Sequence, residues 1–165
     1  MKVPNPKTKQ ISPDALLQAV RLNLLRVPLF HPETVMNLLD ITRDQVKAKI
    51  EDGTFFWAFE VGQSKRRSEP RILALSVVEQ QLGPLPAIGA TRNLKLPQVI
   101  DLILAARDLR STEIKKLFAC GNDWLRDMKP NFVVVQGAKS TSGPNSYTVF
   151  SRASVADWLG KRRMT

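Results

Sequence analysis

Closely spaced basic residues are the side chains of this sequence with the clearest chemistry. Arg43 and Lys47 lie four positions apart, so a helix would carry both on one face. A second group, Lys65-Arg66-Arg67, lies in a polar stretch that predicts a loop. Guanidinium and ammonium groups in such arrangements bind phosphates and the edges of guanine bases. These residues therefore predict recognition of a polyanion.

The residue types that most enzyme sites need are scarce. One cysteine, Cys120, excludes an internal disulfide and a cysteine-cluster metal site, and we interpret it as a buried small hydrophobe. The one histidine, His31, precedes Pro32 at an expected helix start, which favours a surface or capping role. The sequence has no glycine-rich phosphate loop and no acidic metal cluster. We therefore expect a protein that is not an enzyme and that uses no metal and no cofactor.

Length and charge fit a binding protein. The chain has 165 residues, with 25 Lys and Arg against 15 Asp and Glu, and a formal net charge of +10. This length allows one compact domain or two small ones. No apolar run approaches the roughly 20 residues that span a bilayer, and the start MKVPNPKTKQ lacks the apolar stretch of a secretory signal. We expect a cytoplasmic, nucleoid-associated protein with a polyanionic partner and no membrane partner.

The two halves of the chain resemble each other at an offset of 79 residues. The stretch ETVMNLL at 33–39 aligns with TEIKKLF at 112–118, and apolar positions coincide. A two-residue deletion near 129–130 then changes the offset to 77, which aligns Phe55 with Phe132. Apolar positions keep their order through both halves. This pattern indicates an internal duplication.

Each half predicts the same order of elements: a helix with an apolar stripe, a short helix, a tight turn, another short helix, a β-hairpin with a polar loop, and a closing helix. In the first half, Thr42 is the expected N-cap of the second short helix, and Gly53 its left-handed end. The elements expected after the first helix are 32–39, 43–52, 55–61, 71–75 and 77–82, with counterparts at 111–118, 122–128, 132–136, 147–150 and 154–159. The domains expected are units at 12–82 and 96–160, a linker at 83–95, and basic tails at 1–11 and 161–165.

A helix, a tight turn, a helix and a hairpin form a winged helix-turn-helix. Residues of about 33–82 resemble the excisionase and MerR-type DNA-binding module, and the second copy, about 111–159, departs more from it. The matching features are Leu38-Leu39, Ile41-Thr42-Arg43, Val46 with Ile50, Glu51-Asp52-Gly53, Phe55, Lys65-Arg66-Arg67, Arg71-Ile72 and Val78. The second copy lacks the helix-ending glycine, has a less basic loop, and carries Trp124 where the first has Gln45. The expected fold is α+β, with two tandem winged helix-turn-helix units that each have a preceding helix, a two-stranded wing hairpin and a short closing helix.

The resemblance implies a double-stranded DNA-binding protein, either a transcription regulator or an excisionase-like accessory factor for recombination. Recognition helices would enter the major groove, roughly one helical turn of 34–36 Å apart, with the wings on the minor groove or the backbone. Further implied partners are a second copy of the chain, a recombinase or a transcription protein. The candidate DNA-binding residues are Thr42, Arg43, Gln45, Lys47, Lys49, Lys65, Arg66, Arg67 and Arg71 in the first unit, and Asn122, Arg126, Lys129, Lys139 and Asn145 in the second.

Two other interpretations stay open. Acidic residues on the expected recognition faces, Asp44, Glu51 and Asp123, repel phosphate unless they orient a neighbouring arginine. They favour a winged-helix module for protein–protein assembly with weak, nonspecific nucleic-acid binding. In a third version, only the first unit reads DNA and the second dimerises.

Two further groups have structural interpretations. The three tryptophans, Trp57, Trp124 and Trp158, are expected in the core or between the units. The basic run Lys161–Arg163 near the end of the chain is expected to be a solvated end. Neither group is expected to make a specific DNA contact.

Overall fold

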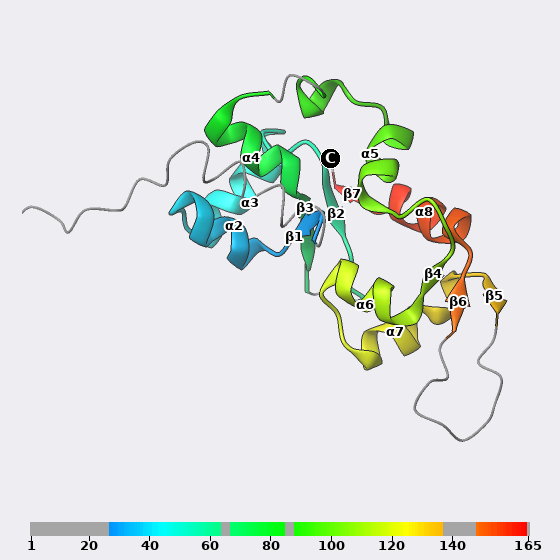
Figure 1. The fold of residues 1–165 in the computed structure, drawn as a ribbon. Helices are drawn as coiled ribbons and strands as arrows, with labels where there is room; N and C mark the ends of the chain where they lie inside the picture. Colours follow the sequence, from blue (N-terminus) through cyan, green and yellow to red (C-terminus); the bar gives the residue numbers. More distant parts are fainter. Residues whose placement is uncertain (1–26, 64–66, 85–87, 137–147, 165) are drawn as a thin grey trace, which may run out of the picture.

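Figure 1 shows the computed structural model of the chain, which describes residues 27–63, 67–84, 88–136 and 148–164. These residues form seven α-helices and two small antiparallel sheets, which confirms the expected α+β class. No described helix is long and apolar enough to cross a membrane. The helix expected at 12–25 lies outside the described residues.

The first unit runs from β1 to α4. Its elements are β1 (Leu29–Phe30), α2 (Pro32–Leu39), α3 (Arg43–Glu51), β2 (Ala58–Glu60), β3 (Pro70–Leu73) and α4 (Ala74–Leu82). The strands β2 and β3 form the first hairpin, and β1 pairs with the other edge of β3. Helices α2 and α3 lie together at one end of the molecule, as Figure 1 shows.

The second unit repeats this order of elements. Its elements are α5 (Leu96–Ile103), β4 (Leu109–Arg110), α6 (Ser111–Phe118), α7 (Asn122–Met128), the 3-10 turn η2 (Lys129–Asn131), β5 (Val134–Gln136), β6 (Val149–Phe150) and α8 (Arg152–Gly160). The turns between the paired helices also match, because Asp40 (φ 52°) and Ala119 (φ 50°), 79 positions apart, both adopt the left-handed conformation. The repeat found in the sequence is therefore visible in the order of elements.

Local capping explains where the helices of the first unit begin and end. The Thr42 hydroxyl accepts a hydrogen bond from the Gln45 amide (3.2 Å), and the Gln45 side chain accepts one from the Thr42 amide (2.8 Å), which forms a capping box. Gly53 has φ +79°, as expected for the left-handed end of α3. His31 caps α2, because its Nδ1 accepts a hydrogen bond from the Glu33 amide (3.3 Å). The capping interpretations of Thr42, Gly53 and His31 are confirmed.

The first hairpin is shorter than the sequence predicted. Strand β2 begins at Ala58 and not at Phe55, because the chain is still turning after α3: the Phe55 amide bonds to the Lys49 carbonyl (2.8 Å). Strand β3 ends at Leu73, so α4 begins at Ala74, three residues earlier than expected. Phe55 nevertheless fills the core, where it is 1% exposed. The apolar pattern located the buried residues but not the strand ends.

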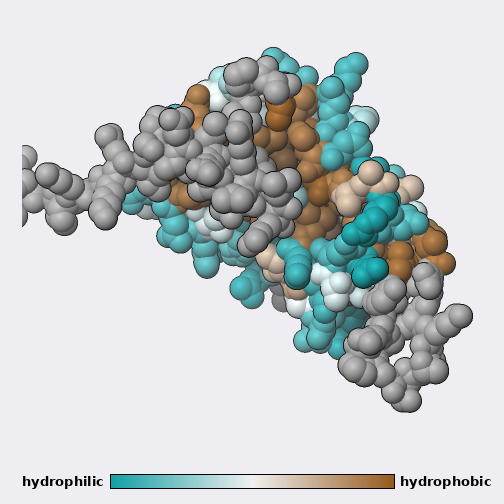
Figure 2. All heavy atoms as spheres, viewed as in Figure 1, coloured by the Kyte–Doolittle hydropathy of each residue, from teal (hydrophilic) through white to brown (hydrophobic). Residues whose placement is uncertain are grey.

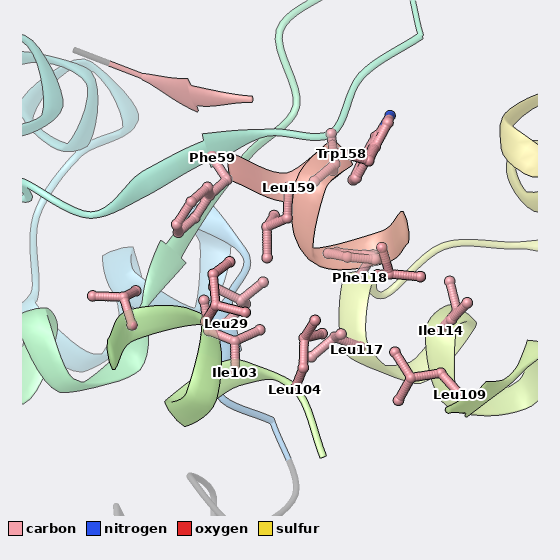
Figure 3. Close-up of a cluster of buried hydrophobic side chains, with 14 of the residues drawn as sticks. Leu29, Phe59, Ile103, Leu104, Leu109, Ile114, Leu117, Phe118, Trp158 and Leu159 are labelled. Carbon is pink, nitrogen blue, oxygen red and sulfur yellow. The ribbon is translucent and has the colours of Figure 1, made fainter. Parts of the chain in front are cut away.

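One hydrophobic core joins the two units. Figure 3 shows side chains from the first unit, such as Leu29 and Phe59, packed with side chains of α5, α6 and α8 from the second. The three tryptophans are buried in this cluster, as expected, and Trp124 and Trp158 contact each other edge to face. A second, smaller cluster lies between α2, α3 and the first sheet, and includes Val35, Val46 and Ile50. The units are therefore parts of one packed body and not independent domains.

The expected linker is packed against the first unit. Within it, the 3-10 turn η1 (Thr91–Asn93) buries Thr91, whose carbonyl accepts a hydrogen bond from Trp57 Nε1 (2.7 Å). The Thr91 amide donates to the Glu79 carboxylate on α4 (3.1 Å). Buried polar partners therefore hold this part of the expected linker at 83–95 against the first unit.

The end of the chain corrects a second expectation. Residues Arg163–Met164 form strand β7, which pairs antiparallel with β2 and extends the first sheet to the order β1-β3-β2-β7. The Arg163 guanidinium lies over the rings of Phe56 (4.0 Å) and Trp57 (4.5 Å). The run 161–163 is therefore no solvated tail, since it ties α8 of the second unit to the sheet of the first.

Hydrogen bonds at the boundary add to the shared core. Arg71 is 2% exposed, and its Nε donates to the Phe118 carbonyl of the second unit (2.8 Å). In the other direction, Trp124 Nε1 donates to the Val61 carbonyl (2.7 Å). The Gln63 side chain donates to the Trp124 carbonyl (3.2 Å). These bonds fix the first hairpin against the α6–α7 turn.

We expect Arg71→Ala to lower the free energy of unfolding by about 2–4 kcal/mol, because buried carbonyls of both units lose their donor. Urea denaturation followed by tryptophan fluorescence measures the change. The control is Arg67→Ala in the same hairpin, whose side chain is 86% exposed and which should stay within about 0.5 kcal/mol of the wild type. Equal effects of the two variants would contradict the role given to Arg71.

The strand β7 gives a second prediction. Arg163→Ala should cost about 1 kcal/mol, since it removes the cation over Phe56 and Trp57. Lys161→Ala is the matched control, because Lys161 makes only an exposed ion pair with Asp157 (2.7 Å). Thermal denaturation of both variants compares them, and an Arg163 variant as stable as the control would refute the packing role of this strand.

Candidate nucleic-acid interface

Helix α3 presents its basic residues to solvent, as the sequence predicted. Val46 and Ile50 are buried, and the 3.6-residue spacing puts Arg43 and Lys47 beside them on the same helix face, at the margin where this face reaches solvent. On that face, the side chains of Arg43 and Lys47 are 67% and 74% exposed. Each makes one exposed ion pair, Arg43 with Glu33 of α2 (3.5 Å) and Lys47 with Glu51 (3.7 Å). Such exposed pairs contribute little and break readily when a stronger anion approaches.

A groove brings this helix face and the first hairpin together. It has a volume of about 190 Å³, and α3 lines one side of it with Arg43, Lys47, Glu51 and the apolar Val46 and Ile50. Ser68 and Pro70 of the hairpin line the other side, and Met164 of β7 contributes to its wall. The sequence pattern predicted Arg43 and Lys47 but not Ser68, Pro70 and Met164, since no local pattern shows that a strand from residues 163–164 returns here.

Two candidate residues of α3 are engaged in its cap. The Thr42 hydroxyl and the Gln45 side-chain oxygen each accept a backbone hydrogen bond of the capping box. The side-chain amide nitrogen of Gln45 and the O–H of Thr42 are the donors left to contact a ligand. Lys49 lies on the side toward Phe55, with its ammonium 6.0 Å from the ring centroid. The lining of the groove includes none of these three residues.

Glu60 organises the first hairpin at its base. Its carboxylate accepts hydrogen bonds from the amides of Gly62 (2.8 Å) and Glu69 (2.7 Å) and from the Ser68 hydroxyl. A side chain at Gly62 would come within 2.8 Å of the Arg67 carbonyl, so this position fits only glycine without a shift. The sequence gave no signal for this role of Glu60. Its bonds hold the two ends of the loop that carries Lys65, Arg66 and Arg67.

Of the three basic residues in that loop, Arg67 is among the described residues. The Arg67 side chain is 86% exposed and makes an ion pair with Glu69 (3.9 Å). Lys65 and Arg66 lie outside the described residues. Arg67 is therefore the residue of the predicted basic loop whose side chain the structure shows in solvent.

Arg71 corrects the prediction made for it. The resemblance placed it at the base of the wing as a DNA contact, but its guanidinium is buried at the boundary of the two units. Its Nη1 donates to the Pro70 carbonyl (3.0 Å), and its Nη2 lies 3.8 Å from Cys120 Sγ. A side chain so enclosed offers no surface to a phosphate. It supports the hairpin from behind.

The second unit presents a different surface. On α7, Arg126 makes ion pairs with Asp123 (3.0 Å) and Asp127 (3.4 Å), so its charge is locally balanced. Asn122 accepts a hydrogen bond from the Lys115 ammonium (2.7 Å). Lys129 begins the turn η2 that follows α7. Two further candidates, Lys139 and Asn145, lie outside the described residues.

The position of Gln45 in the repeat shows how the units differ. Gln45 caps its own helix, whereas its counterpart Trp124 is buried and donates a hydrogen bond to Val61 of the first unit. A cleft of about 430 Å³ lies between the first hairpin and the α6–α7 turn, lined by Gln63, Arg67, Glu69, Ala119, Cys120, Gly121 and Trp124. The first hairpin thus lies between α3 on one side and the turn of the second unit on the other.

Cys120 lies in this turn and is partly buried. Its Sγ donates to the Phe118 carbonyl (3.1 Å), and burial raises the pKa of its thiol. A thiol whose pKa is raised is mostly protonated at neutral pH and is a poor nucleophile. This environment agrees with the interpretation of Cys120 as a small residue of the packed interior.

Most of the excess positive charge lies outside the described residues. Eight of the 25 Lys and Arg, and one of the 15 acids, fall in the undescribed segments, which leaves 17 against 14 on the described ones. Residues 1–26 alone carry five Lys or Arg and one Asp. The positive and negative charges of the described residues therefore nearly cancel. Any attraction of these residues for a polyanion must come from a few basic side chains at one place.

Comparison with known proteins adds no relative. The chain matches no protein-family model, no curated protein and no solved structure. In the part of the chain that the structure describes, no group of three or more His, Cys, Asp or Glu could hold a metal ion. Function has to be inferred from the arrangement of α3, the first hairpin and the charges around them.

The histidine beside this face gives a prediction for pH dependence. Burial, and then the positive charge of Arg71, lowers the pKa of His31 below its ordinary value of about 6.5. The folded state therefore binds fewer protons here than the unfolded state, so this stabilisation is complete above pH 6.5 or so and is lost as the pH falls through the lowered pKa. We expect the free energy of unfolding to fall more between about pH 7.5 and pH 5.5 in the wild type than in His31→Asn, which keeps a capping acceptor. Parallel curves for the two proteins would contradict this.

Proposed function

We propose that this protein binds double-stranded DNA and that its first unit reads the sequence. The observation that carries the proposal is the groove shared by α3 and the first hairpin, with Arg43 and Lys47 exposed along it. In a winged helix-turn-helix, such a helix enters the major groove, and the hairpin follows the backbone or the minor groove. Arg43 and Lys47 would then reach guanine edges or phosphates. The loop with Lys65, Arg66 and Arg67 would be the wing.

The acidic neighbours of these residues do not oppose this assignment. Glu33 and Glu51 pair with Arg43 and Lys47 at 3.5 and 3.7 Å while both partners are exposed. Exposed pairs of this kind are worth about 0–1 kcal/mol, whereas a good bidentate base contact is worth about 1–3 kcal/mol. The carboxylates therefore keep the basic side chains extended on the surface until DNA replaces them.

The second unit has a supporting role in this proposal. Arg126 already has two aspartate partners, and Trp124 is buried against the first unit. The shared core holds α7 against the first unit, so its first turn, with Trp124 buried, is not free to enter a DNA groove. The version in which one unit reads DNA is therefore favoured over the tandem pseudo-dimer.

The remaining basic charge would add affinity without specificity. Residues 1–26 carry five Lys or Arg, and each phosphate that such a group neutralises steepens the salt dependence of binding by about 0.9 in log–log slope. A protein of this kind serves either as a transcription regulator or as an excisionase-like accessory factor, associated with the nucleoid. Both roles use the same interface on duplex DNA.

The test compares matched pairs of substitutions in the two units. Arg43→Ala with Lys47→Ala should weaken binding to a preferred duplex by about 10- to 100-fold, because two side chains that face the groove are lost. Arg126→Ala with Lys129→Ala should change it by less than about threefold. The duplex is first selected from a random pool at about 150 mM salt, and affinities are then measured by fluorescence anisotropy across a salt series.

Three results would count against the proposal. Equal losses in the two double variants would refute the assignment of reading to the first unit. Absence of any enriched duplex, with binding that fades uniformly as salt rises, would refute specific recognition. Binding to a protein partner that does not change with salt would favour the assembly module instead.

A further inference from the structure

Strand β5 has an open and apolar edge. Within the described residues the second sheet has the order β4-β6-β5, so β5 pairs with β6 on one side only. Val133, Val134 and Val135 are 60%, 44% and 56% exposed, which makes them three of the four large apolar side chains described as exposed. Figure 2 shows a hydrophobic area over this strand, beside the grey atoms. Exposed apolar strands at a sheet edge are sites for pairing with another chain.

In the first unit, another strand pairs with the equivalent edge of the sheet. Strand β2, the counterpart of β5 in the repeat, is covered on its outer edge by β7, with Ala58 opposite Met164 and Phe59 opposite Arg163. The Glu60 amide also donates to the Arg162 carbonyl (2.7 Å). A short antiparallel strand therefore fills this edge in the first unit, and the chain supplies only one such strand to the two units in its described part.

The sequence of β5 lacks the usual protection against self-pairing. Natural edges carry lysine, proline or inward-pointing charge, but Phe132–Gln136 has no charged residue and no proline. Two copies of an uncharged strand meet without repulsion. A register shift at Val135 bends the strand and limits regular pairing to a few residues.

We propose that β5 pairs antiparallel with β5 of a second copy of this chain and forms a twofold-symmetric dimer. An antiparallel strand is complementary to itself about a twofold axis, so one surface serves both partners. The two second sheets would then join into one sheet across the axis. The valines of each copy would cover those of the other.

The surroundings favour a second copy over other occupants. The strand offers no acid that would attract the basic residues 1–26, and no base that would attract a nucleic acid. The partner of β5 in the sheet, β6 (Val149–Phe150), is uncharged as well. An uncharged strand is best matched by another uncharged strand, and among the edge strands of the described sheets β5 is the one with exposed large apolar side chains.

The expected dimer is weak. A stable, specific interface buries roughly 1,200–2,000 Å² in total, and a strand of three residues supplies only part of that area. We therefore expect a dissociation constant on the order of 10–100 µM, which corresponds to a monomer at low concentration and a dimer at high concentration.

Sedimentation velocity of the full chain without DNA tests the proposal, over about 1–300 µM to span that constant. The wild type should change from monomer to dimer across this range. Val133→Lys and Val135→Lys should each raise the dissociation constant at least about tenfold, since charge at the edge opposes pairing. Val135→Thr, which keeps a β-branched side chain, should still dimerise. Leu102→Lys is the matched control, because Leu102 is exposed on α5 away from this edge.

The outcomes separate this proposal from its rivals. A wild type that stays monomeric over the whole range overturns it, and so does a dimer that both lysine variants leave intact. Loss of dimer in Leu102→Lys as well would assign the interface to another surface. Circular dichroism melting checks that each variant is folded. If one lysine variant is unfolded, the other lysine variant is compared with Val135→Thr. The sedimentation experiment contains no DNA, so its result does not depend on whether the protein binds DNA.

Discussion

The boundary between the two units depends on a buried cation. Arg71 carries its charge into the interior, where leaving it without acceptors would cost several kcal/mol. Its main acceptor is the Phe118 carbonyl at the end of α6, 47 residues away, where the partial negative charge of the helix dipole also favours a cation. The second unit must therefore lie against the first for Arg71 to be satisfied. The shared core and the bond from Trp124 to Val61 act in the same direction, and together they fix the first hairpin and its groove.

The same boundary accounts for the divergence of the two halves. At matching positions the first unit has Gln45, which caps α3, and the second has Trp124, which packs into the boundary. A helix that docks through its first turn has lost part of the surface with which it would enter a DNA groove. The first unit keeps its exposed Arg43 and Lys47, because its α3 is anchored from below by Val46 and Ile50. Elements at matching positions of the two halves can thus take different roles through a few side chains.

The sequence predicted features that depend on residues close in the chain, and it did not predict those that depend on distant residues. Helix ends set by local chemistry, such as the Thr42 cap and Gly53, were predicted correctly, and the apolar spacing located Val46 and Ile50 in the core. Errors occurred where the partner is distant in the chain. Arg71 bonds to Phe118, residues 163–164 pair with β2, and Thr91 bonds to Trp57. A basic residue near a chain end is usually solvated, and no neighbour in the sequence indicates otherwise.

The two sheet edges explain how one small chain could both bind DNA and assemble. Strand β2 is closed by β7, so the first unit has no free edge on that side among the described residues, and the exposed Arg43 and Lys47 lie along the groove beside α3. Strand β5 lacks such a cover and carries exposed valines where a wing would need cations. A DNA-reading role for the second hairpin would place these valines against water or phosphate, which is unfavourable. Covering them with a second chain removes that cost, and it relates two copies of α3 by a twofold axis. A twofold pair of reading helices matches a palindromic DNA site, so the open edge and the exposed arginine and lysine of α3 are consistent with a single function.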